Sequence, residues 1–354
     1  MVELAARLSS HGLIVDLVTG DTPDQFPDRI REVANVIPLF GSQGELRNRF
    51  AKSLKHVLPL RRYLSNFNPD VLFVTWRTSE ATLAWLGTKR RSRLVFNAQV
   101  ALEPIWRRLS KPRRYLHRSV LRFAYGAADS VVSPSKGVAE EIQKIANLKD
   151  GKVKVLPNPV IRTLREVSGQ VTLRRRGGEA VILGAGSLIK QKGFDVLLEA
   201  FNIIRKKREA RLVIVGEGPD RDSLEEKARE LGIEDDVEMP GYVQNIFEYF
   251  EAADLFVLSS NWEGFGLVVV EALSAGKPVV TTDCPYGPRE ILDDGHYGEI
   301  VPVGDSLGMA EAIDRTLANP PSRQLLQNRA EEFDAEKVVE KYARLFSGEN
   351  AVCE

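Results

Sequence analysis

Short apolar runs alternate with segments of helical periodicity along the whole chain. The apolar runs, rich in β-branched residues, predict strands, and recurrence of apolar residues every three or four positions predicts helices. The predicted strands are 13–19, 71–76, 93–98, 130–135, 153–158, 180–186, 211–218, 236–243, 254–260, 278–283 and 298–303. The predicted helices include 45–65, 112–127, 136–147, 193–207, 220–231, 245–252, 266–275 and 306–318. This alternation predicts an α/β fold made of βαβ units with parallel sheets.

The predicted elements fall into two sets, which indicate two doubly wound domains. The polar stretch 165–179, rich in Arg and Gly, is the best candidate for the linker. We therefore expect one Rossmann-like domain over residues 1–165 and a second over residues 176–333. Residues 334–354 contain a last helical pattern, 334–346, which we expect to pack back on the first domain.

Composition agrees with two globular domains and indicates the cell compartment. The 354 residues are 43% hydrophobic and 28% charged, enough for two sizeable cores. The two cysteines, Cys284 and Cys353, are too few for a disulfide framework or a zinc site, which suits a reducing compartment. Neither an apolar run of about 20 residues nor a secretory signal pattern is present, so we expect a cytoplasmic protein.

Charge differs sharply between the two halves. Residues 1–170 hold 28 Lys and Arg against 15 Asp and Glu, an excess of 13 positive charges that the remaining residues balance. Residues 88–122 contain eleven of these basic residues and one Glu, with Trp106 and Tyr115 among them. This stretch predicts a solvated basic face, a surface for anionic membranes or a nucleic-acid surface. Nucleic acid is disfavoured because the sequence holds no motif for it.

The turn after the strand 180–186 is a candidate phosphate site. "GAGSLIKQKGF" offers Gly184 and Gly186 for close backbone approach and Lys192 as a positive charge. A dinucleotide fingerprint needs a third glycine where Ile189 stands, so NAD binding is disfavoured.

The turn "VGEGPDRDS" is a second, weaker candidate. Arg221 stands at its third-glycine position, so it does not match the dinucleotide fingerprint either. Asp220 and Asp222 resemble a metal-binding DxD, but an Asp at the start of a helix favours capping of that helix.

The stretch "NWEGFGLVVVEALSAGKPVV" predicts an anion site at a helix start. Gly264 and Gly266 let the backbone approach a ligand, and a helix from about Leu267 points its N–H groups at an anion. Glu263 can accept hydrogen bonds from a polyol, and Glu271, about one turn into the helix, from a diol. The alternative is structural, with Glu263 at a helix start and Glu271 paired with a lysine.

"EGFGLVVVE" resembles the E-x7-E element of the family 4 retaining glycosyltransferases, which have the GT-B fold of two Rossmann-like domains facing a cleft. The resemblance covers nearly the whole chain, because further segments follow the family's order and spacing. These segments are "NPDVLFV", "ADSVVSPSKGVAEEI", "VLPNPV", "GSLIKQKGF", "LVIVGEGP", "GYV", "AGKPVVTTD" and "GPREIL".

The resemblance implies roles for particular residues. Glu263 and Lys192 would be catalytic, by holding the donor sugar and the diphosphate. The implied donor-binding residues are Gly186, Ser187, Lys192, Glu217, Tyr242, Val243, Gly264, Phe265, Gly266, Leu267 and Glu271. No metal and no cofactor are expected, since amides and a lysine would stabilise the departing diphosphate.

Two departures from the family pattern are visible. Ser187 stands where an Arg is common, so Lys192 is the main charge on the diphosphate unless Arg289 contributes. Where many relatives carry a His, the nearest polar residues are Asn97 and Gln99. The expected acceptor-side residues are Asn97, Gln99, Arg107 and Arg108.

The expected function is transfer of a hexose or N-acetylhexosamine from a UDP-sugar to a glycan or lipid-linked acceptor in cell-surface polysaccharide or glycolipid synthesis. Peripheral binding to the inner face of the plasma membrane would then accompany the cytoplasmic location. The alternative is a catalytically impaired nucleotide-sugar-binding protein. Family members place a strand before the helix predicted here at residues 1–10, so we also expect a truncated N-terminus with the first strand missing.

Overall fold

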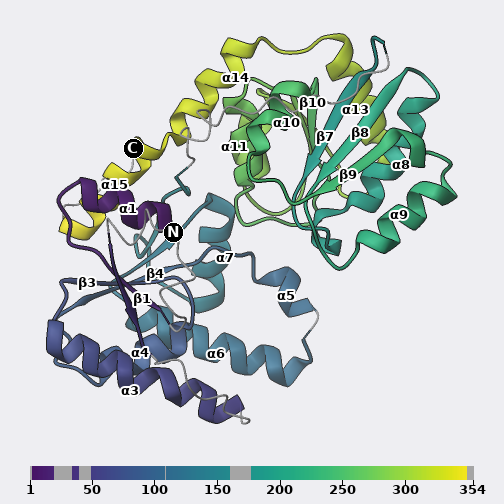
Figure 1. Cartoon of the computed structure of the whole chain (residues 1–354). Coiled ribbons are helices and arrows are strands. Elements are labelled where there is room, and N and C mark those ends of the chain that lie inside the picture. Colours follow the sequence, from purple (N-terminus) through teal and green to yellow (C-terminus); the bar gives the residue numbers. More distant parts are fainter. Residues whose placement is uncertain (1, 20–33, 40–48, 108, 160–176, 349–354) are drawn as a thin grey trace. The chain divides into compact units, whose positions relative to one another are not determined.

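The computed structural model describes residues 2–19, 34–39, 49–107, 109–159 and 177–348 (Figure 1). The chain divides into two compact units. The first consists of residues 1–134, 138–159 and 336–354, and the second of residues 135–137 and 160–335. The prediction of an α/β chain with two sets of parallel strands is confirmed.

In the first unit, one sheet has four parallel strands in the order β3-β4-β5-β6. Its strands are β3 (Val71–Val74), β4 (Arg93–Asn97), β5 (Ser130–Ser133) and β6 (Val153–Val155). Within the described residues, β1 (Asp16–Thr19) and β2 (Asn35–Pro38) pair in a separate parallel sheet. The helices are α1 (Val2–Ser10), α3 (Arg49–Phe67), α4 (Thr78–Leu86), α5 (Glu103–Arg107), α6 (Lys111–Ala127), α7 (Lys136–Ala146) and α15 (Ala335–Ser347).

Helix α15 belongs to the first unit although it ends the described chain. Its residues Val338, Val339 and Tyr342 are fully buried and share a core with Val95 of β4 and Val132 of β5. This apolar contact brings the last helix onto the first sheet.

The second unit has one six-stranded parallel sheet in the order β12-β11-β10-β7-β8-β9. Its strands are β7 (Ala180–Ala185), β8 (Ala210–Val215), β9 (Val237–Gly241), β10 (Leu255–Leu258), β11 (Val279–Thr282) and β12 (Glu299–Val301). The helices are α8 (Phe194–Arg205), α9 (Arg221–Glu230), α10 (Ile246–Ala252), α11 (Leu267–Ser274), α12 (Pro288–Ile291), α13 (Ser306–Ala318) and α14 (Arg323–Ala330).

Both faces of the six-stranded sheet are covered by helices. Along β7, Val181 and Leu183 pack into one core with α10, α11 and α14. Ile182, between them, packs into the opposite core with α8, α9 and α13. Because successive side chains point to opposite faces, a strand buried on both sides has a continuous apolar sequence, as β7 has.

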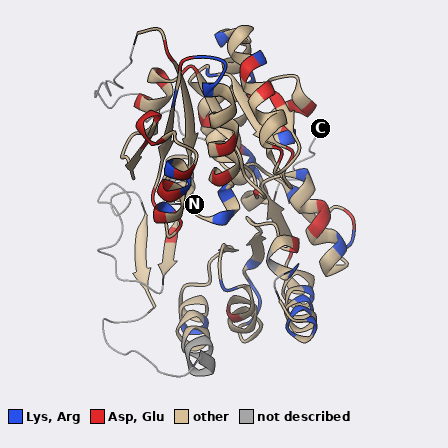
Figure 2. Cartoon of the chain, turned by 90° about the vertical axis from the view of Figure 1, so that its right-hand side faces the viewer, with Lys and Arg blue, Asp and Glu red and all other residues tan. Residues whose placement is uncertain are grey.

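Every predicted strand forms, whereas five short strands and α-helices of the described residues escaped prediction: β2, α4, α5, α12 and α14. Helices α5 and α12 have five and four residues, too few to show a helical period. Most of the predicted linker 165–179 lies outside the described residues. Figure 2 shows that Asp and Glu are concentrated in the second unit, as the uneven charge predicted.

Candidate functional site

The second sheet has a topological switch point between β7 and β10. From β7 the chain continues outward to β8 and β9, and from β10 it continues in the other direction to β11 and β12. The loops after β7 and β10 therefore leave the same edge of the sheet in opposite directions. Ligands of open parallel sheets bind at this place, outside the carboxyl ends of the strands.

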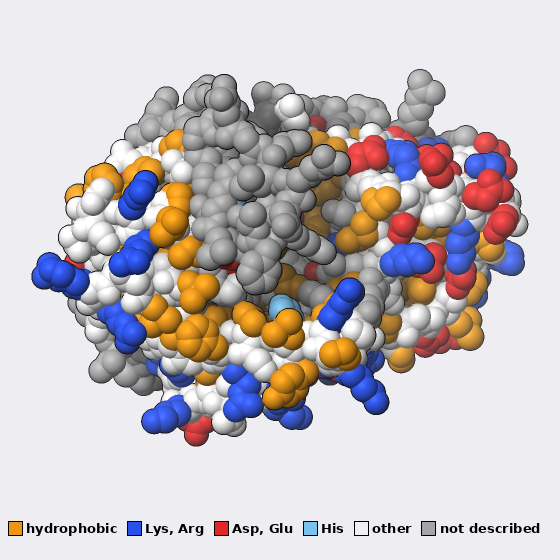
Figure 3. Space-filling model, turned by 90° about the horizontal axis from the view of Figure 1, so that it is seen from below, with side chains coloured by type: hydrophobic (Ala, Val, Ile, Leu, Met, Phe, Trp, Pro, Cys, Tyr) orange, Lys and Arg blue, Asp and Glu red, His pale blue; other side chains and the backbone are white. Residues whose placement is uncertain are grey.

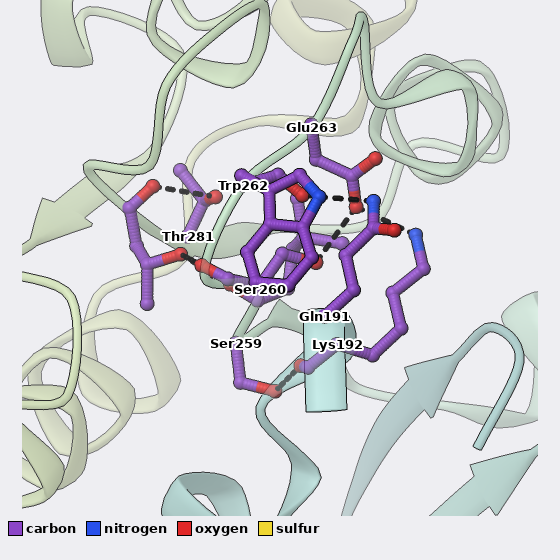
Figure 4. A network of polar contacts seen from close by, with 9 residues as sticks. Gln191, Lys192, Ser259, Ser260, Trp262, Glu263 and Thr281 are labelled. Carbon is purple, nitrogen blue, oxygen red and sulfur yellow. Dashed lines mark hydrogen bonds and ion pairs between the residues drawn. The ribbon is translucent and has the colours of Figure 1, made fainter. Parts of the chain in front are cut away.

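Hydrogen bonds join the loops that follow β7 and β10 (Figure 4). Backbone N–H of Asn261 donates to the Gln191 carbonyl at 2.7 Å, and Gln191 Nε2 donates to the Trp262 carbonyl at 2.9 Å. Ser259 Oγ donates to the carbonyl of Lys192 at 2.7 Å. The two loops thus form one connected surface above the switch point.

Lys192 and Glu263 form an ion pair across these loops. Lys192 Nζ lies 2.6 Å from Glu263 Oε1, and the two side chains are 17% and 8% exposed. Ser260 Oγ donates to the same Oε1 at 2.7 Å. The sequence predicted separate ligand contacts for Lys192 and Glu263, which stay predictions, and it did not predict that the two side chains contact each other.

Gly186 makes room for the lysine stem. At this glycine φ is +150°, and a Cβ atom would lie 3.0 Å from Lys192 Cε. At the neighbouring Gly184, a glycine is favoured for a different reason, because an added Cβ atom would meet Leu197 and Phe194 in the core. Contact with these core side chains explains the glycine without a ligand, and approach of a ligand to Gly184 stays a prediction. Ser187 is exposed at the start of the same loop.

Helix α11 begins where the sequence predicted. Gly266 precedes Leu267 in the left-handed conformation, with φ of +91°, which favours glycine. The Phe265 ring is buried and packs edge-on against Phe333, so only the Phe265 backbone is available to a ligand. No side chain caps the start of this eight-residue helix, so its first N–H groups are suited to an anion.

Glu271 is a partly buried carboxylate in α11. Within the described residues, no hydrogen bond or ion pair reaches its side-chain oxygens, and burial raises the pKa of Glu271. The alternative of a pairing with lysine is therefore unsupported. A carboxylate held in this way is suited to accept hydroxyl donors from a ligand.

Glu217 lies against the loop that holds Tyr242. Arg221 donates to both Glu217 oxygens, at 2.8 and 3.1 Å, and to the Met239 carbonyl at 3.0 Å. Hydrogen bonding from Arg221 lowers the pKa of Glu217. A Cβ on Gly241 would lie 2.7 Å from Glu217 Oε1. Tyr242 itself is 80% exposed, next to a partly buried Val243.

Sequence reasoning missed the role of Arg221, which it had noted only for not being a glycine. The i, i+4 spacing of Glu217 and Arg221 was the available signal. Asp220 occupies the N-cap position of α9, as expected of an Asp at a helix start. Its side chain makes no capping hydrogen bond, so the expected capping interaction is wrong.

The Arg289 guanidinium is bound by two carboxylates, and its contribution to diphosphate binding stays a prediction. Its guanidinium makes two hydrogen bonds to Asp283, at 2.8 and 2.7 Å, and one to Asp294 at 3.2 Å. Cys284 is buried near the ion pair, where burial first and the charge of Glu263 second raise its pKa to about 12. The thiol is therefore neutral near pH 7 and is no nucleophile.

In the first unit, the predicted acceptor-side amides form a chain at the ends of β4 and β6. Gln99 Nε2 donates to Asn97 Oδ1, and Asn158 Nδ2 donates to Gln99 Oε1, both at 2.6 Å. Asn158 was not predicted, although it lies in the "VLPNPV" segment. Arg107 is exposed on α5 and faces Glu103, and Arg108 lies outside the described residues.

The described part of the chain holds neither a metal-binding cluster nor a membrane-spanning helix. No cluster of three or more His, Cys, Asp or Glu side chains is placed to hold a metal ion. Among the helices described, none is long and apolar enough to cross a bilayer.

Comparison with curated proteins identifies relatives named as glycosyltransferases. A lipopolysaccharide core biosynthesis glycosyltransferase of Rhizobium meliloti is 29% identical over 62% of this chain and 64% of that protein. An N-acetylgalactosaminyltransferase of Campylobacter jejuni, acting on a diphospho-undecaprenol-linked glycan by its name, is 28% identical over 63% of this chain and 61% of that protein. The matches therefore span less than two thirds of these relatives.

Solved structures show the same fold. A lipopolysaccharide outer core galactosyltransferase superposes with a TM-score of 0.76, at 20% identity over 98% of this chain and 94% of that chain. Anabaena HepE, solved with UDP-glucose, superposes with a TM-score of 0.78, at 19% identity over 98% of this chain and 95% of that chain.

Family models match both halves of the chain. Residues 1–163 match the model described as Glycosyltransferase Family 4, and residues 170–333 match the model described as Glycosyl transferases group 1. The two matches follow each other along the sequence: the first contains strands β1 to β6, and the second contains the six-stranded sheet. The chain therefore belongs to the family 4 glycosyltransferases of the GT-B fold.

Proposed function

We propose that the chain is a retaining glycosyltransferase that uses a nucleotide sugar as donor. The observation that carries this proposal is the Lys192–Glu263 ion pair, located at the switch point and close in sequence to the start of α11. It places a positive charge and helix N–H groups, both suited to a diphosphate, beside a carboxylate suited to a sugar. The transferred unit is a hexose or an N-acetylhexosamine.

Each group has a distinct part in the proposed reaction. The diphosphate binds Lys192 and the amides of Gly266 and Leu267, and Glu263 then accepts hydrogen bonds from the sugar hydroxyls. Glu271 accepts the two ribose hydroxyls, which accounts for a carboxylate that has no partner among the described residues. The loop that contains Glu217 and the loop that contains Tyr242 and Val243 contact the base.

Transfer then proceeds on one face of the sugar. The bond from the anomeric carbon to the diphosphate oxygen breaks, and a bond from that carbon to the acceptor oxygen forms on the same face. The departing diphosphate oxygen takes the acceptor's proton, so no protein base is required. Lys192 and the fixed amides lower the barrier by stabilising the charge that develops on the leaving group, and no metal ion has a part in this scheme.

The donor is a UDP-sugar in this proposal. Support comes from Anabaena HepE, which has the same fold and was solved with UDP-glucose. The acceptor is a glycan or a lipid-linked glycan of cell-surface polysaccharide synthesis. Support comes from the names of the curated relatives, which refer to lipopolysaccharide core and to a diphospho-undecaprenol-linked acceptor.

The surface of α6 favours an acceptor at an anionic membrane. Tyr115, Leu116 and Phe123 are 75%, 65% and 53% exposed on this helix. Exposed Lys and Arg accompany them, and on the face of the first unit in Figure 3 hydrophobic and basic side chains are interleaved. Aromatic and aliphatic side chains flanked by cations are typical of helices that lie at a lipid interface.

A panel of UDP-sugars with radiolabelled sugar tests the proposal. The chain is incubated with each donor and with membranes or extracted lipid-linked glycans, and release of UDP and capture of label are measured. Label in the glycan fraction with retained anomeric configuration supports the proposal. Tight binding of a UDP-sugar without consumption, with every acceptor, supports the alternative of a nucleotide-sugar-binding protein. Absence of both overturns the donor assignment.

A further inference from the structure

Glu263 Oε1 has two hydrogen-bond donors, and the proposed function removes one of them. Lys192 Nζ and Ser260 Oγ lie 2.6 and 2.7 Å from this oxygen. When a diphosphate arrives, Lys192 must turn toward it. Ser260 is then the protein donor that remains on the Glu263 carboxylate within the described residues.

We propose that Ser260 is a positioning residue that holds the Glu263 carboxylate in register with the donor sugar. The inference rests on the proposed function, because the lysine is displaced only if a diphosphate binds there. Ser260 does not touch the substrate in this proposal. It acts through Glu263.

Ser260 is itself fixed in place. It is fully buried, and its carbonyl accepts a hydrogen bond from Thr282 Oγ1 at 2.5 Å, from the end of the neighbouring strand β11. A hydroxyl with so little freedom fixes the direction from which it donates. The carboxylate of Glu263 therefore keeps one defined orientation when its ion pair opens.

The backbone of Glu263 is also fixed, so that side-chain rotation is the main remaining freedom. Its N–H donates to the Pro285 carbonyl at 2.6 Å, and its carbonyl accepts from the N–H of Tyr286 at 3.2 Å. The hydroxyl of Ser260 restricts the rotation that these backbone bonds leave open. Small errors in the position of a catalytic group reduce rate strongly, which makes this restriction relevant to turnover.

The two adjacent serines have different tasks. Ser259 Oγ donates to the backbone carbonyl of Lys192, so it fastens the lysine loop. Ser260 Oγ donates to the Glu263 side chain. Figure 4 shows both hydroxyls in the same network of contacts.

Ser260→Ala in the full chain tests the inference. We expect kcat to fall roughly 10- to 100-fold, as for loss of one hydrogen bond to a charged group. KM for the donor changes less than kcat, and affinity for UDP, which has no sugar, stays unchanged. Ser260→Cys, of similar volume with a weaker donor, recovers part of the lost kcat.

A double mutant separates positioning from a general effect on the fold. In a Glu263→Ala background, Ser260→Ala has nothing to position, so we expect no further loss of kcat. Thr316→Val is the control for removal of a buried hydroxyl, since Thr316 lies on α13 and its hydroxyl donates to the Ala312 carbonyl of the same helix. Additive losses in the double mutant, or equal loss of UDP binding in Ser260→Ala, overturn the inference.

The proposed function and this inference fail in different ways. A wild-type chain that turns over no donor contradicts the proposed function. Calorimetry still tests Ser260 in that case, because the inference requires Ser260→Ala to lose the extra affinity that the sugar adds over UDP alone. An active wild type with an unaffected Ser260→Ala variant contradicts only the role of Ser260.

Discussion

Lys192 Nζ lies 2.6 Å from Glu263 Oε1, so the residue proposed to bind the diphosphate and the residue proposed to bind the sugar neutralise each other's charge. Binding must break this ion pair and replace it with contacts to the ligand. Removal of the Glu263 charge should therefore strengthen binding of a diphosphate to Lys192, whereas removal of the Lys192 charge should weaken it.

Glu263→Gln should tighten binding of UDP by roughly 1 kcal/mol, because no carboxylate then competes with the diphosphate for Lys192. The same variant should lose about 100- to 1000-fold in turnover, since the sugar loses a contact that acts in the transition state. Calorimetry with UDP and a transfer assay measure the two effects.

Glu299→Gln is the matched control, because it breaks the Arg315–Glu299 ion pair elsewhere in the second unit. It should leave UDP affinity unchanged. Weaker UDP binding in Glu263→Gln, or undiminished sugar transfer, would show that the pair does not have the role assigned to it.

Glu271→Gln should stabilise the ligand-free chain at neutral pH while weakening UDP binding by about 1.5–3 kcal/mol. Burial raises the pKa of Glu271 above its ordinary value of 4.5, so the folded chain favours the neutral carboxyl group. The stability that this group contributes is complete below pH 4.5 and is lost as pH rises through the raised pKa.

Melting temperatures across pH 4 to 8 check the direction in which stability changes with pH. The variant and the wild type should melt together at the acid end, and the variant should melt higher as pH increases. Uridine should distinguish the two proteins as well as UDP does, because the lost contact is to ribose. A variant that melts lower than the wild type at every pH would mean that the carboxylate has a stabilising partner.

The second sheet was predictable because its central strands are buried on both faces. β7 and β10 have continuous apolar sequences, and such runs are recognisable without a structure. The start of α11 was predictable for a local reason, since Gly266 adopts the left-handed conformation before an apolar helix. Short elements such as α5 lack a periodic signal.

The contacts within the site were less predictable, because they join residues far apart in sequence. Lys192 and Glu263 are separated by 71 positions, and only the strand order brings their loops together. Arg221 belongs to the same class, because its bond to the Met239 carbonyl depends on how β9 lies beside β8. Sequence patterns place such residues at one edge of a sheet but do not pair their side chains.

Gln99→Ala should reduce transfer to the acceptor without changing UDP binding. Gln99 joins Asn97 to Asn158 through two 2.6 Å hydrogen bonds, so its loss opens the amide chain at the ends of β4 and β6. Transfer at saturating donor should fall about tenfold, as for loss of one or two neutral hydrogen bonds. Gln143→Ala, on α7 of the same unit, removes a surface amide that bonds Asp150 and serves as control. Equal effects of the two substitutions on transfer would show that the amide chain is not part of the acceptor site.

Binding of α6 to anionic lipid should depend on charge and on apolar side chains together. Arg113→Gln with Arg122→Gln should weaken binding to vesicles that contain phosphatidylglycerol by up to about 1 kcal/mol per charge, and added salt should reproduce this loss. Leu116→Ser with Phe123→Ser should weaken binding at high salt as well, because these exposed side chains would enter the lipid interface.

Arg229→Gln with Arg323→Gln is the control, because it removes the same charge from the second unit and should not weaken binding to vesicles. Co-sedimentation with vesicles measures all three pairs, and UDP affinity should stay constant throughout. If the α6 variants bind vesicles as the wild type does, the basic helix is a solvated face and the acceptor reaches the first unit without it.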